Sequence, residues 1–331
     1  MYKKVFLSVI AVIILVAAFY YFLSFIQNGS EEKIIKIGVV RTPPALDVAW
    51  EGFKRKMDEL GWREGKNIEY VVEASGNNFE EAKKSIDKFL KDGVDMIYTM
   101  GVSSTRAAKE VTAEKNPNLP VVFGVVSDPV GGGLVQSEVS SGNNLTGVTP
   151  SQEIVGSKRL EIFLEISPDL KRIIFPWNDP KTTGVNELKN TASLLKIEFL
   201  DKKVESVDEL DSFLSSFLFR KGDGILRATD SVSAGRTKQM IALAIDKKIP
   251  LAGTNLGDTR NGALFSYGAS YAVIGEQAAV LVHKILRGAK PSELPIEGAN
   301  QIELAVNLKT AELIGLDISD KFLSKADLVI K

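Results

Sequence analysis

Hydrophobic and polar positions follow two different periods along the chain from residue 33 onward. Short runs of apolar and β-branched residues, such as Ile34–Val40 and Met96–Met100, are typical of buried strands. Between them, segments such as Ala45–Leu60 and Phe79–Leu90 carry apolar residues at helical spacing. Strands that alternate with helices favour a parallel sheet with helices on both faces. The pattern therefore predicts an α/β fold.

The strand–helix units fall into two successive sets, which indicates two similar lobes. The first set ends with the strand Leu145–Val148, and the second begins with the strand Arg172–Phe175. One further unit, Gly262–Tyr267 followed by the helix Tyr271–Leu286, comes after the second set. A hinged two-lobe protein crosses between lobes more than once, so we expect this unit to complete the first lobe. The predicted divisions are residues 1–32 as an N-terminal segment, 33–148 plus 263–297 as lobe 1, and 149–262 plus 298–331 as lobe 2.

An uncharged segment, Val5–Ile26, precedes the part that is expected to fold. Its 22 residues would form a helix about 33 Å long, enough to cross a hydrocarbon core of about 30 Å. Lys3 and Lys4 stand before it, which places the N-terminus in the cytoplasm and the rest of the chain outside. The alternative is a cleaved signal peptide, which needs a small-residue site that the bulky Phe22–Ile26 does not offer. We therefore predict a single-pass anchor in the lipid bilayer of the cell membrane, with the C-terminal folded part extracellular or periplasmic.

Composition narrows the chemistry that the chain can perform. The length of 331 residues suits two domains, and a net charge of -1 gives no electrostatic footprint for nucleic acid. No cysteine is present, which excludes disulfides, thiol nucleophiles and a lipid-modified cysteine anchor. His283, the single histidine, favours a packed or surface role over metal binding or general-base catalysis. We therefore expect no cofactor, no metal, no catalytic residue and no enzymatic activity.

Five short motifs keep a fixed order and spacing between Ile34 and Gly315. They are Pro44-Ala45-Leu46-Asp47 with Gly52-Phe53, Leu60–Asn67, Ser127–Gly131, Gly142–Val148, and Tyr267-Gly268 with Tyr271. Together these motifs resemble the ABC-transporter substrate-binding family that includes receptors for aromatic amino acids. The resemblance implies a periplasmic-binding-protein-like fold, in which two doubly wound, mostly parallel sheets are joined by a multi-strand hinge. It also implies a small-molecule solute as ligand and an ABC permease in the membrane as partner.

Two positions depart from the pattern of that family. The family's usual His-Pro before Ala-Leu-Asp is Pro43-Pro44 here, and an Asn-Ser pair common in the second lobe corresponds to Thr183-Gly184. Both departures lie near the positions that set ligand specificity in the family. The resemblance therefore leaves the identity of the solute open.

Candidate binding residues follow the predicted strands, because ligands of open α/β sheets lie outside the carboxyl ends of the strands. After Gly101, Ser103 and Ser104 are helix-cap candidates, and the exposed N–H groups there can receive a carboxylate. Asp128 could face an ammonium group or merely cap the turn before the glycine run Gly131–Gly133, which has neither the spacing nor the lysine of a phosphate loop. The candidates in lobe 1 are Thr42, Asp47, Ser103, Ser104, Ser127 and Asp128.

A second set of candidates belongs to lobe 2 and to the crossing between lobes. Asp230 matches an aspartate of the family and is the best candidate for a ligand amine, with a helix N-cap as the alternative. Trp177 could form a stacking wall or belong to the core, whereas Trp50 and Trp62 favour packing. The candidates in lobe 2 and at the crossing are Trp177, Asn178, Thr229, Asp230, Tyr267 and Tyr271.

These observations predict a receptor that closes on a solute without chemical change. An amino acid, aromatic in some members of the family, is favoured because the serines and the aspartates offer a site for a carboxylate and for an amine. A sensor for a membrane signalling partner is an alternative that the sequence does not separate from an importer subunit. An enzyme on the same frame lacks a catalytic set, and a DNA-binding repressor would need a helix-turn-helix where this chain has the apolar segment.

Overall fold

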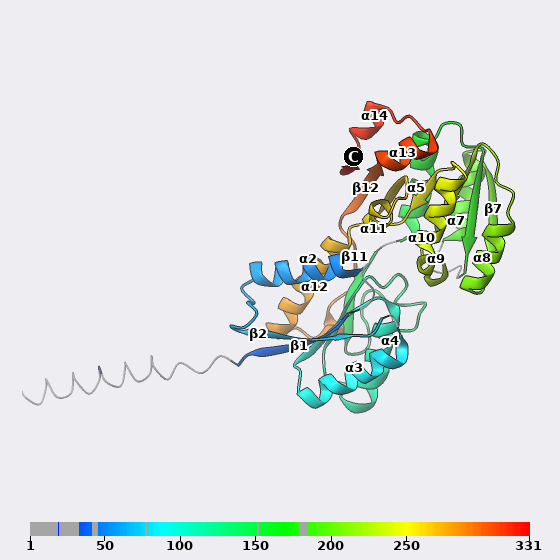
Figure 1. The fold of residues 1–331 in the computed structure, drawn as a ribbon. Helices are drawn as coiled ribbons and strands as arrows, with labels where there is room; N and C mark the ends of the chain where they lie inside the picture. Colours follow the sequence, from blue (N-terminus) through cyan, green and yellow to red (C-terminus); the bar gives the residue numbers. More distant parts are fainter. Residues whose placement is uncertain (1–18, 20–32, 42–45, 77, 151, 179–183) are drawn as a thin grey trace, which may run out of the picture.

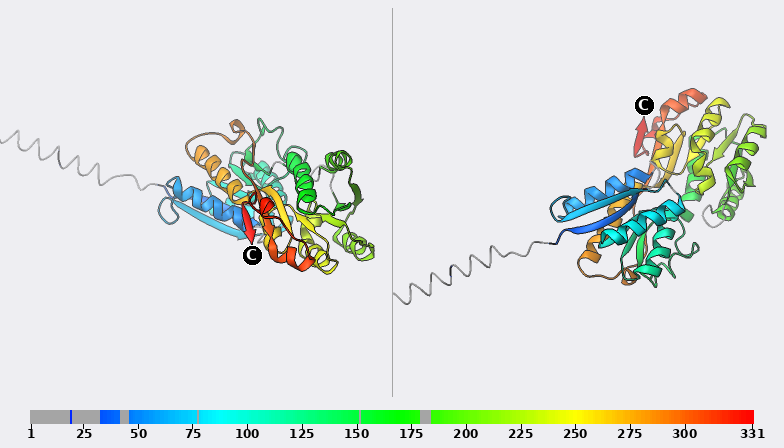
Figure 2. Two further views of the ribbon diagram at one scale, coloured as in Figure 1. Left: turned by 90° about the horizontal axis from the view of Figure 1, so that it is seen from above. Right: turned by 60° about the horizontal axis from the view of Figure 1, so that its bottom comes forward.

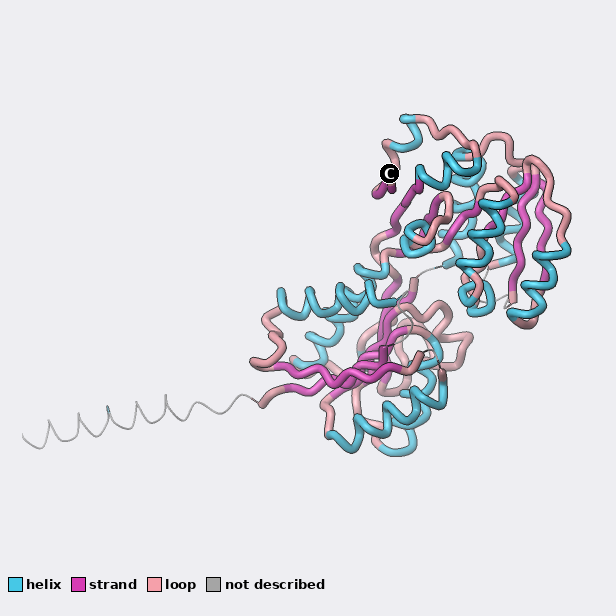
Figure 3. Tube along the Cα trace, in the orientation of Figure 1, coloured by secondary structure: helices cyan, strands magenta, loops and turns pink. Residues whose placement is uncertain are grey.

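Two β-sheets form the centres of two lobes. The computed structural model describes Phe19 and residues 33–41, 46–76, 78–150, 152–178 and 184–331. Figure 1 shows the lobes one above the other, with the first sheet below and the second above. The views in Figure 2 and the tube in Figure 3 show the same separation, with helices packed around the strands of each lobe. The predicted two-lobed α/β architecture is confirmed.

The first sheet has six strands, and every pair in it is parallel, in the order β11-β5-β4-β3-β1-β2. All five residues of β3 are buried, because helices cover both faces, and such strands are continuous apolar runs in the sequence. The strands are β1 (Ile35–Arg41), β2 (Ile68–Ala74), β3 (Met96–Met100), β4 (Val121–Gly124), β5 (Leu145–Thr149) and β11 (Glu297–Gly298).

Helices cover the two faces of the first sheet. On one face α2 and α12 approach so closely that glycine is needed at both contact points. A Cβ at Gly52 would lie 2.1 Å from the carbonyl oxygen of Ala272, and a Cβ at Gly275 would lie 1.9 Å from the carbonyl oxygen of Ala49. On the other face α3 begins at Asn78, whose side chain accepts from the backbone N–H groups of the first turn. The helices are α2 (Asp47–Glu59), α3 (Phe79–Asp92), α4 (Val102–Lys115), α12 (Tyr271–Leu286) and the short 3₁₀ helix η2 (Pro291–Glu293).

The second sheet has seven strands in the order β13-β12-β10-β9-β8-β6-β7. The pair β10–β12 is antiparallel, and every other pair in this sheet is parallel. The strands are β6 (Arg172–Trp177), β7 (Glu198–Lys203), β8 (Asp223–Leu226), β9 (Leu251–Gly253), β10 (Phe265–Ala269), β12 (Ile302–Asn307) and β13 (Leu328–Ile330).

Two apolar cores cover the faces of this second sheet. One joins Phe163 of α5 to Phe265 of β10, with ring centroids 5.4 Å apart, and the other gathers around Met240 of α10. Each core excludes water from one face of the strands, which is what stabilises a sheet of this kind. The helices are α5 (Gln152–Ile166), α7 (Val185–Leu194), α8 (Val207–Ser216), α9 (Ser231–Gly235), α10 (Thr237–Asp246), α11 (Leu256–Arg260), α13 (Leu308–Ile314) and α14 (Asp320–Leu323).

The chain crosses between the lobes three times, each time at the carboxyl edge of a sheet. It leaves β5 for α5, β10 for α12, and β11 for β12. The crossing segments are bonded to one another, since Ala299 N–H donates to the Thr149 carbonyl (2.8 Å) and Ser270 N–H to the Gln301 carbonyl (3.0 Å). The carboxyl edges of both sheets therefore face the junction between the lobes.

The structure corrects the predicted place of one strand. The segment 263–297 was assigned to lobe 1, but β10 lies in the second sheet between β9 and β12, and the crossing falls at Ser270. Phe265 of β10 is fully buried and packs against Phe163 in the core of that sheet. This packing with a residue distant in the sequence places β10 in the second sheet. Helix α5 is not among the elements predicted from the sequence, and two helices, α9 and α10, follow β8.

The predicted anchor Val5–Ile26 lies outside the described residues except for Phe19. Among the residues that the structure does describe, no helix combines the length and the apolar character needed to cross a bilayer. The candidate Thr42 also lies outside the described residues.

Candidate ligand-binding site

The facing carboxyl edges define where a ligand of this fold binds. A small cavity of about 50 Å³ lies at this junction. Val48 of α2 and Tyr271 of α12 line it from the first lobe, and Asn255 and Glu303 line it from the second. The loops that follow the strands of both sheets surround the same junction and form one wall of it from each lobe.

On the wall of lobe 1, Asp47 begins α2 and pairs with the last residue of β1. The Arg41 Nη2 lies 2.7 Å from Asp47 Oδ1, and both side chains are partly exposed. The hydrogen bond and the charge of Asp47 raise the pKa of Arg41. The carboxylate of Asp47 is therefore already neutralised, which leaves it less suited to bind a ligand amine by itself.

The two serines after Gly101 have different surroundings. Gly101 adopts φ +83°, a backbone conformation that favours glycine, and this turns the chain from β3 into α4. Ser104 is fully buried, and its hydroxyl donates to the Met100 carbonyl at 2.8 Å. Ser103 is half-buried, and no hydrogen bond joins its hydroxyl to a described residue. The geometry leaves Ser103 accessible to a ligand and directs Ser104 into its own turn.

The loop after β4 uses Asp128 as a cap. Its Oδ1 accepts from the N–H of Gly131 at 2.6 Å, which is the turn-capping role that the sequence left open for it. The neighbouring Ser127 is half-buried, and its carbonyl accepts from the hydroxyl of Thr149 at 3.1 Å. This bond ties the loop to the first crossing segment.

On the wall of lobe 2, Asp230 joins two loops. One carboxylate oxygen accepts from the Ser233 N–H at 2.7 Å, and the other accepts from the Asn178 N–H at 2.8 Å. Asp230 is 4% exposed and is the N-cap of α9. Its bond to the Asn178 N–H brings two of the candidate residues together. A carboxylate offers about four acceptor positions, and these two bonds occupy one on each oxygen. The half-buried Thr229 directly precedes it.

Trp177 packs within lobe 2. Its indole Nε1 donates to Asp201 Oδ2 at 3.1 Å, and the ring lies against the core that contains Phe163 and Phe175. These contacts support the core role that the sequence left open for Trp177. Trp50 is also in a core, and Trp62 donates to His283 Nδ1 at 3.0 Å, which accounts for the packed role expected for the histidine.

A buried charged cluster lies at the carboxyl edge of the second sheet. Its residues are not among the candidates predicted from the sequence. Arg227, which follows β8 and is 4% exposed, donates through Nε to Asp258 Oδ2 at 2.9 Å and through Nη2 to the Thr254 hydroxyl at 2.6 Å. Asp258 also accepts from the Thr254 N–H at 2.7 Å. Arg227 therefore has its carboxylate partner within the cluster.

Arg159 of α5 is the second cation of this cluster and is 3% exposed. Its Nε donates to the Tyr267 carbonyl at 3.0 Å, and its Nη1 lies 3.5 Å from the Arg227 carbonyl. Burial, and then the charge of Arg227, lower the pKa of Arg159 to about 10. One signal could have found it: Arg159, Phe163 and Ile166 recur at helical spacing and share the buried face of α5.

The two tyrosines at the crossing have separate roles. Tyr267 lies within β10 and contributes its carbonyl to Arg159. Tyr271 opens α12 and lies close to the cluster from the other lobe: burial raises its pKa, while the charge of Arg227 and the amide of Asn255 oppose that rise. Tyr271 therefore connects the first lobe to the charged cluster of the second.

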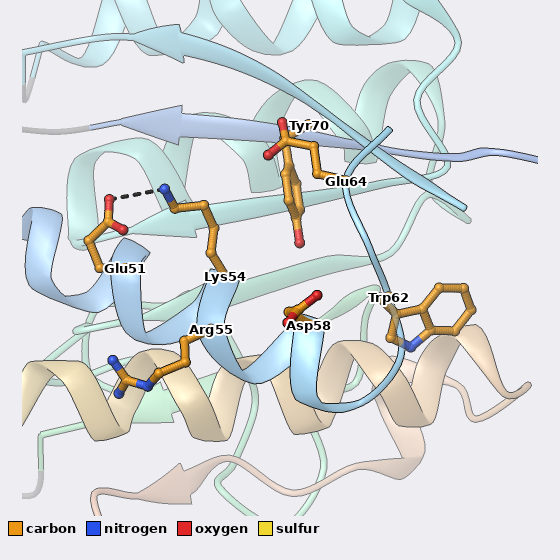
Figure 4. A pocket seen from close by; sticks show the side chains of 7 residues that line it. All are labelled: Glu51, Lys54, Arg55, Asp58, Trp62, Glu64 and Tyr70. Carbon is orange, nitrogen blue, oxygen red and sulfur yellow. Dashed lines mark ion pairs between the residues drawn. The ribbon is translucent and has the colours of Figure 1, made fainter. Parts of the chain in front are cut away.

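A wider groove of about 470 Å³ lies on the outside of lobe 1 and is shown in Figure 4. Glu51 and Lys54, both on α2, form an ion pair at 3.1 Å on one side of it, and Asp58, Glu64 and Tyr70 also line it. It runs along α2 toward the amino edge of the sheet, away from the crossings, so it is not the candidate site. Among the described residues, no group of three His, Cys, Asp or Glu side chains could hold a metal ion.

Comparison with known proteins decides the family. Residues 34–330 match the model of the family described as ABC transporter substrate binding protein. The chain belongs to this family. It is a family of solute-binding proteins rather than of enzymes, and the resemblance read from the five motifs is confirmed.

Several known proteins are similar to this chain over nearly the whole folded part. A tyrosine-binding protein of Clostridioides difficile is 26% identical over 292 residues, which are 87% of this chain and 83% of the relative. A conserved domain protein of Vibrio cholerae is 27% identical with a TM-score of 0.77, over 90% of this chain and 100% of the other. A Streptococcus pneumoniae domain in complex with L-Trp is 22% identical, with a TM-score of 0.77 over 89% and 99% of the two chains. The fold is therefore that of the periplasmic binding proteins.

Proposed function

We propose that the protein is the extracytoplasmic solute receptor of an ABC-type importer, and that it binds an amino acid, with aromatic ones favoured, between its lobes. The observation that carries this function is the position of the three crossings, all at the carboxyl edges of the sheets. Rotation about them brings together two walls that both present polar side chains. Ser103 and Asp128 belong to one wall, and Asn178, Asp230 and the charged cluster belong to the other.

The family relationship supports the importer role, and one relative supports the choice of solute. The Clostridioides difficile protein is named for tyrosine binding, and its similarity extends over both lobes. The proposed ligand carries an amine, for which the carboxylate of Asp230 is the candidate partner, and an aromatic ring that burial between lobes would favour.

Ligand binding acts by shifting an equilibrium between open and closed arrangements of the lobes. A solute that contacts both walls binds the closed form more tightly than the open one, and its differential affinity sets the extent of closure. The closed form then offers a permease the outer surfaces of both lobes in one fixed relation. No chemical step is needed.

The segment Val5–Ile26 is proposed as the membrane anchor that holds this receptor at its partner. The six residues 27–32 span at most about 20 Å when extended, so the folded part would stay close to the bilayer. Tethering raises the local concentration of a receptor at a membrane partner without any new contact.

Calorimetric titration tests the proposed function directly. The full chain, purified in detergent, is titrated with the twenty amino acids and with purine and sugar controls. We expect saturable binding of at least one amino acid, with tyrosine or tryptophan among the tightest. Binding of sugars or purines alone would contradict the proposed ligand class.

A further inference from the structure

Two buried guanidinium groups share one carboxylate at the carboxyl edge of the second sheet. Arg227 is paired with Asp258, as its 2.9 Å bond shows. Arg159 has two carbonyl oxygens as partners and no carboxylate among the described residues. Both arginines are more than nine-tenths buried. The cluster therefore carries one positive charge more than its own side chains neutralise.

The position of Arg159 places this charge at the ligand wall. Its two carbonyl partners belong to Tyr267 of β10, one residue past the pair that Ser266 forms with the last residue of β9, and to Arg227, which directly follows β8. Strand β9 lies between these two strands, so the guanidinium lies at the carboxyl edge of three neighbouring strands. Ligands of such sheets bind outside this edge.

The cluster also borders the junction with lobe 1. Thr254, which accepts from Arg227, in turn accepts from the amide of Asn255 at 3.2 Å. Asn255 and Tyr271 line the cavity between the lobes. Arg227, beside which Arg159 lies, is thus linked to the lining of that cavity by polar side chains rather than separated from it by an apolar core.

An unpaired guanidinium is costly to bury, and the fold does not need one at this position. A long apolar side chain would pack at the same place on α5, whose neighbouring buried residues are Leu160 and Phe163. A buried cation without an anion is expected where a ligand supplies the anion, because the fork of arginine matches a carboxylate with two parallel hydrogen bonds.

We propose that Arg159, with Arg227 beside it, binds the carboxylate of the solute from lobe 2. This inference rests on the proposed solute-receptor function and fixes the orientation of its ligand. The sequence pattern favours Ser103 and Ser104 of lobe 1 for the carboxylate, but the hydroxyl of Ser104 is already bonded to the Met100 carbonyl. The amine and the side chain of the solute then extend along Asp230 and toward lobe 1.

The test compares ligands that differ in one group and variants that differ in one charge. Tyrosine, tyramine, which lacks the carboxylate, and 4-hydroxyphenylpropionate, which lacks the amine, are titrated into the full chain. The variants are Arg159→Gln and the matched control Lys158→Gln, which removes the same charge from the exposed neighbouring residue. We expect Arg159→Gln to weaken tyrosine binding by about 10- to 150-fold, the range for hydrogen bonds to a charged group.

Tyramine should bind the wild-type protein more weakly than tyrosine by a similar factor, and Arg159→Gln should remove that preference. Lys158→Gln should keep both the affinity and the preference. An Arg159→Gln protein that still prefers tyrosine over tyramine would overturn the inference while leaving the receptor function intact.

The remaining outcomes separate the two proposals. If the wild-type protein binds a carboxylate that is not an amino acid and Arg159→Gln loses it, the inference holds and the amino-acid assignment fails. If the wild-type protein binds only solutes without an anionic group, the inference fails. If Arg159→Gln does not fold, the wild-type protein and Arg159→Lys still test the inference. Equal affinity of the wild-type protein for tyrosine and tyramine would overturn it. A preference for tyrosine that Arg159→Lys reduces would support it.

Discussion

Arg159 Nη1 lies 3.5 Å from the carbonyl oxygen of Arg227, so two buried arginines meet at the carboxyl edge of one sheet. The amino edge of the same sheet holds a different arrangement. There Arg172 binds Asp223 with two bonds, of 2.8 Å and 2.7 Å. Arg172 thus has a complete carboxylate partner, while Arg159 has none among the described residues, and this contrast separates a structural arginine from one available to a ligand.

The first prediction concerns stability at neutral pH. The lowered pKa of Arg159 corresponds to a cost of roughly 3 kcal/mol for keeping it charged, against two hydrogen bonds of about 1–1.5 kcal/mol each. We expect Arg159→Gln to change the free energy of unfolding by no more than about 1 kcal/mol. Arg172→Gln should lose about 3–5 kcal/mol, because it leaves the buried Asp223 unpaired. Urea unfolding of both variants measures the difference, and equal losses would contradict the distinction.

The second prediction is the pH dependence of that cost. The pKa of Arg159 is about 10 in the folded protein and higher in the unfolded chain, where water solvates the guanidinium, so above pH 10 the unfolded state binds more protons. The buried charge of Arg159 therefore destabilises the fold fully below pH 10. This destabilisation is relieved as the pH rises above 10. The stability of the wild-type protein relative to Arg159→Gln should rise between pH 9 and pH 10.5.

Arg227, Asp258 and Tyr271 face the same space as Arg159, so a control must keep them unchanged. Lys158→Gln does so, and its stability relative to the wild-type protein should not follow the trend. An unchanged difference between Arg159→Gln and the wild-type protein across this range would show that Arg159 is not desolvated.

The third prediction separates the two roles of Asp230. Asp230→Ala removes the cap of α9 and the link to Asn178, and should cost about 1–2 kcal/mol of stability. Asp230→Asn keeps an oxygen acceptor for the cap and loses the charge. If Asp230 also receives the ligand amine, Asp230→Asn should keep most of the stability and still lose affinity for tyrosine. Unchanged affinity in a stable Asp230→Asn protein would leave Asp230 a cap alone.

The fourth prediction concerns the contact of α2 with α12. Gly275→Ala places a methyl group 1.9 Å from the Ala49 carbonyl oxygen, which is backbone and moves only if the helices separate. We expect a loss of about 1–3 kcal/mol, as for other overpacked sites. The control is Gly156→Ala in α5, where the added carbon would meet Leu188 at 3.6 Å. That change should be neutral or stabilising by up to about 1 kcal/mol, as thermal unfolding would show.

Much of the fold could be predicted from the sequence because its strands are covered on both faces. The buried strand β3 is a continuous apolar run, and such runs alternate visibly with helical segments. The sheet to which β10 belongs could not be predicted, since its partners β9 and β12 are chosen by packing between residues distant in the sequence. In helix α5, Leu160 and Ile162 are buried as well as Arg159, Phe163 and Ile166, so apolar residues between the helically spaced ones obscure the pattern in the sequence.

The candidate site was predicted in part for a related reason. Strand ends are recognisable in sequence, so Asn178 and Asp230 were both identified, and the structure joins them by a 2.8 Å hydrogen bond. A side-chain direction is not recognisable, and Ser104 points into its own turn. The charged cluster is assembled from three separate segments of the chain, because Arg159 lies in α5, Arg227 follows β8 and Asp258 lies in α11. No local pattern brings them together.

The distance between the lobes with and without solute tests the central claim most directly. Because the chain has no cysteine, spin labels can be attached at Val139→Cys in lobe 1 and Ser215→Cys in lobe 2, both exposed positions. Pulsed electron paramagnetic resonance then measures the distribution of label distances. The account predicts a shorter distance on saturation with the bound amino acid, and for Arg159→Gln it predicts that a higher ligand concentration, by the same factor as its loss of affinity, is needed for the same change. An identical distribution in the free and the saturated wild-type protein would contradict closure around a ligand.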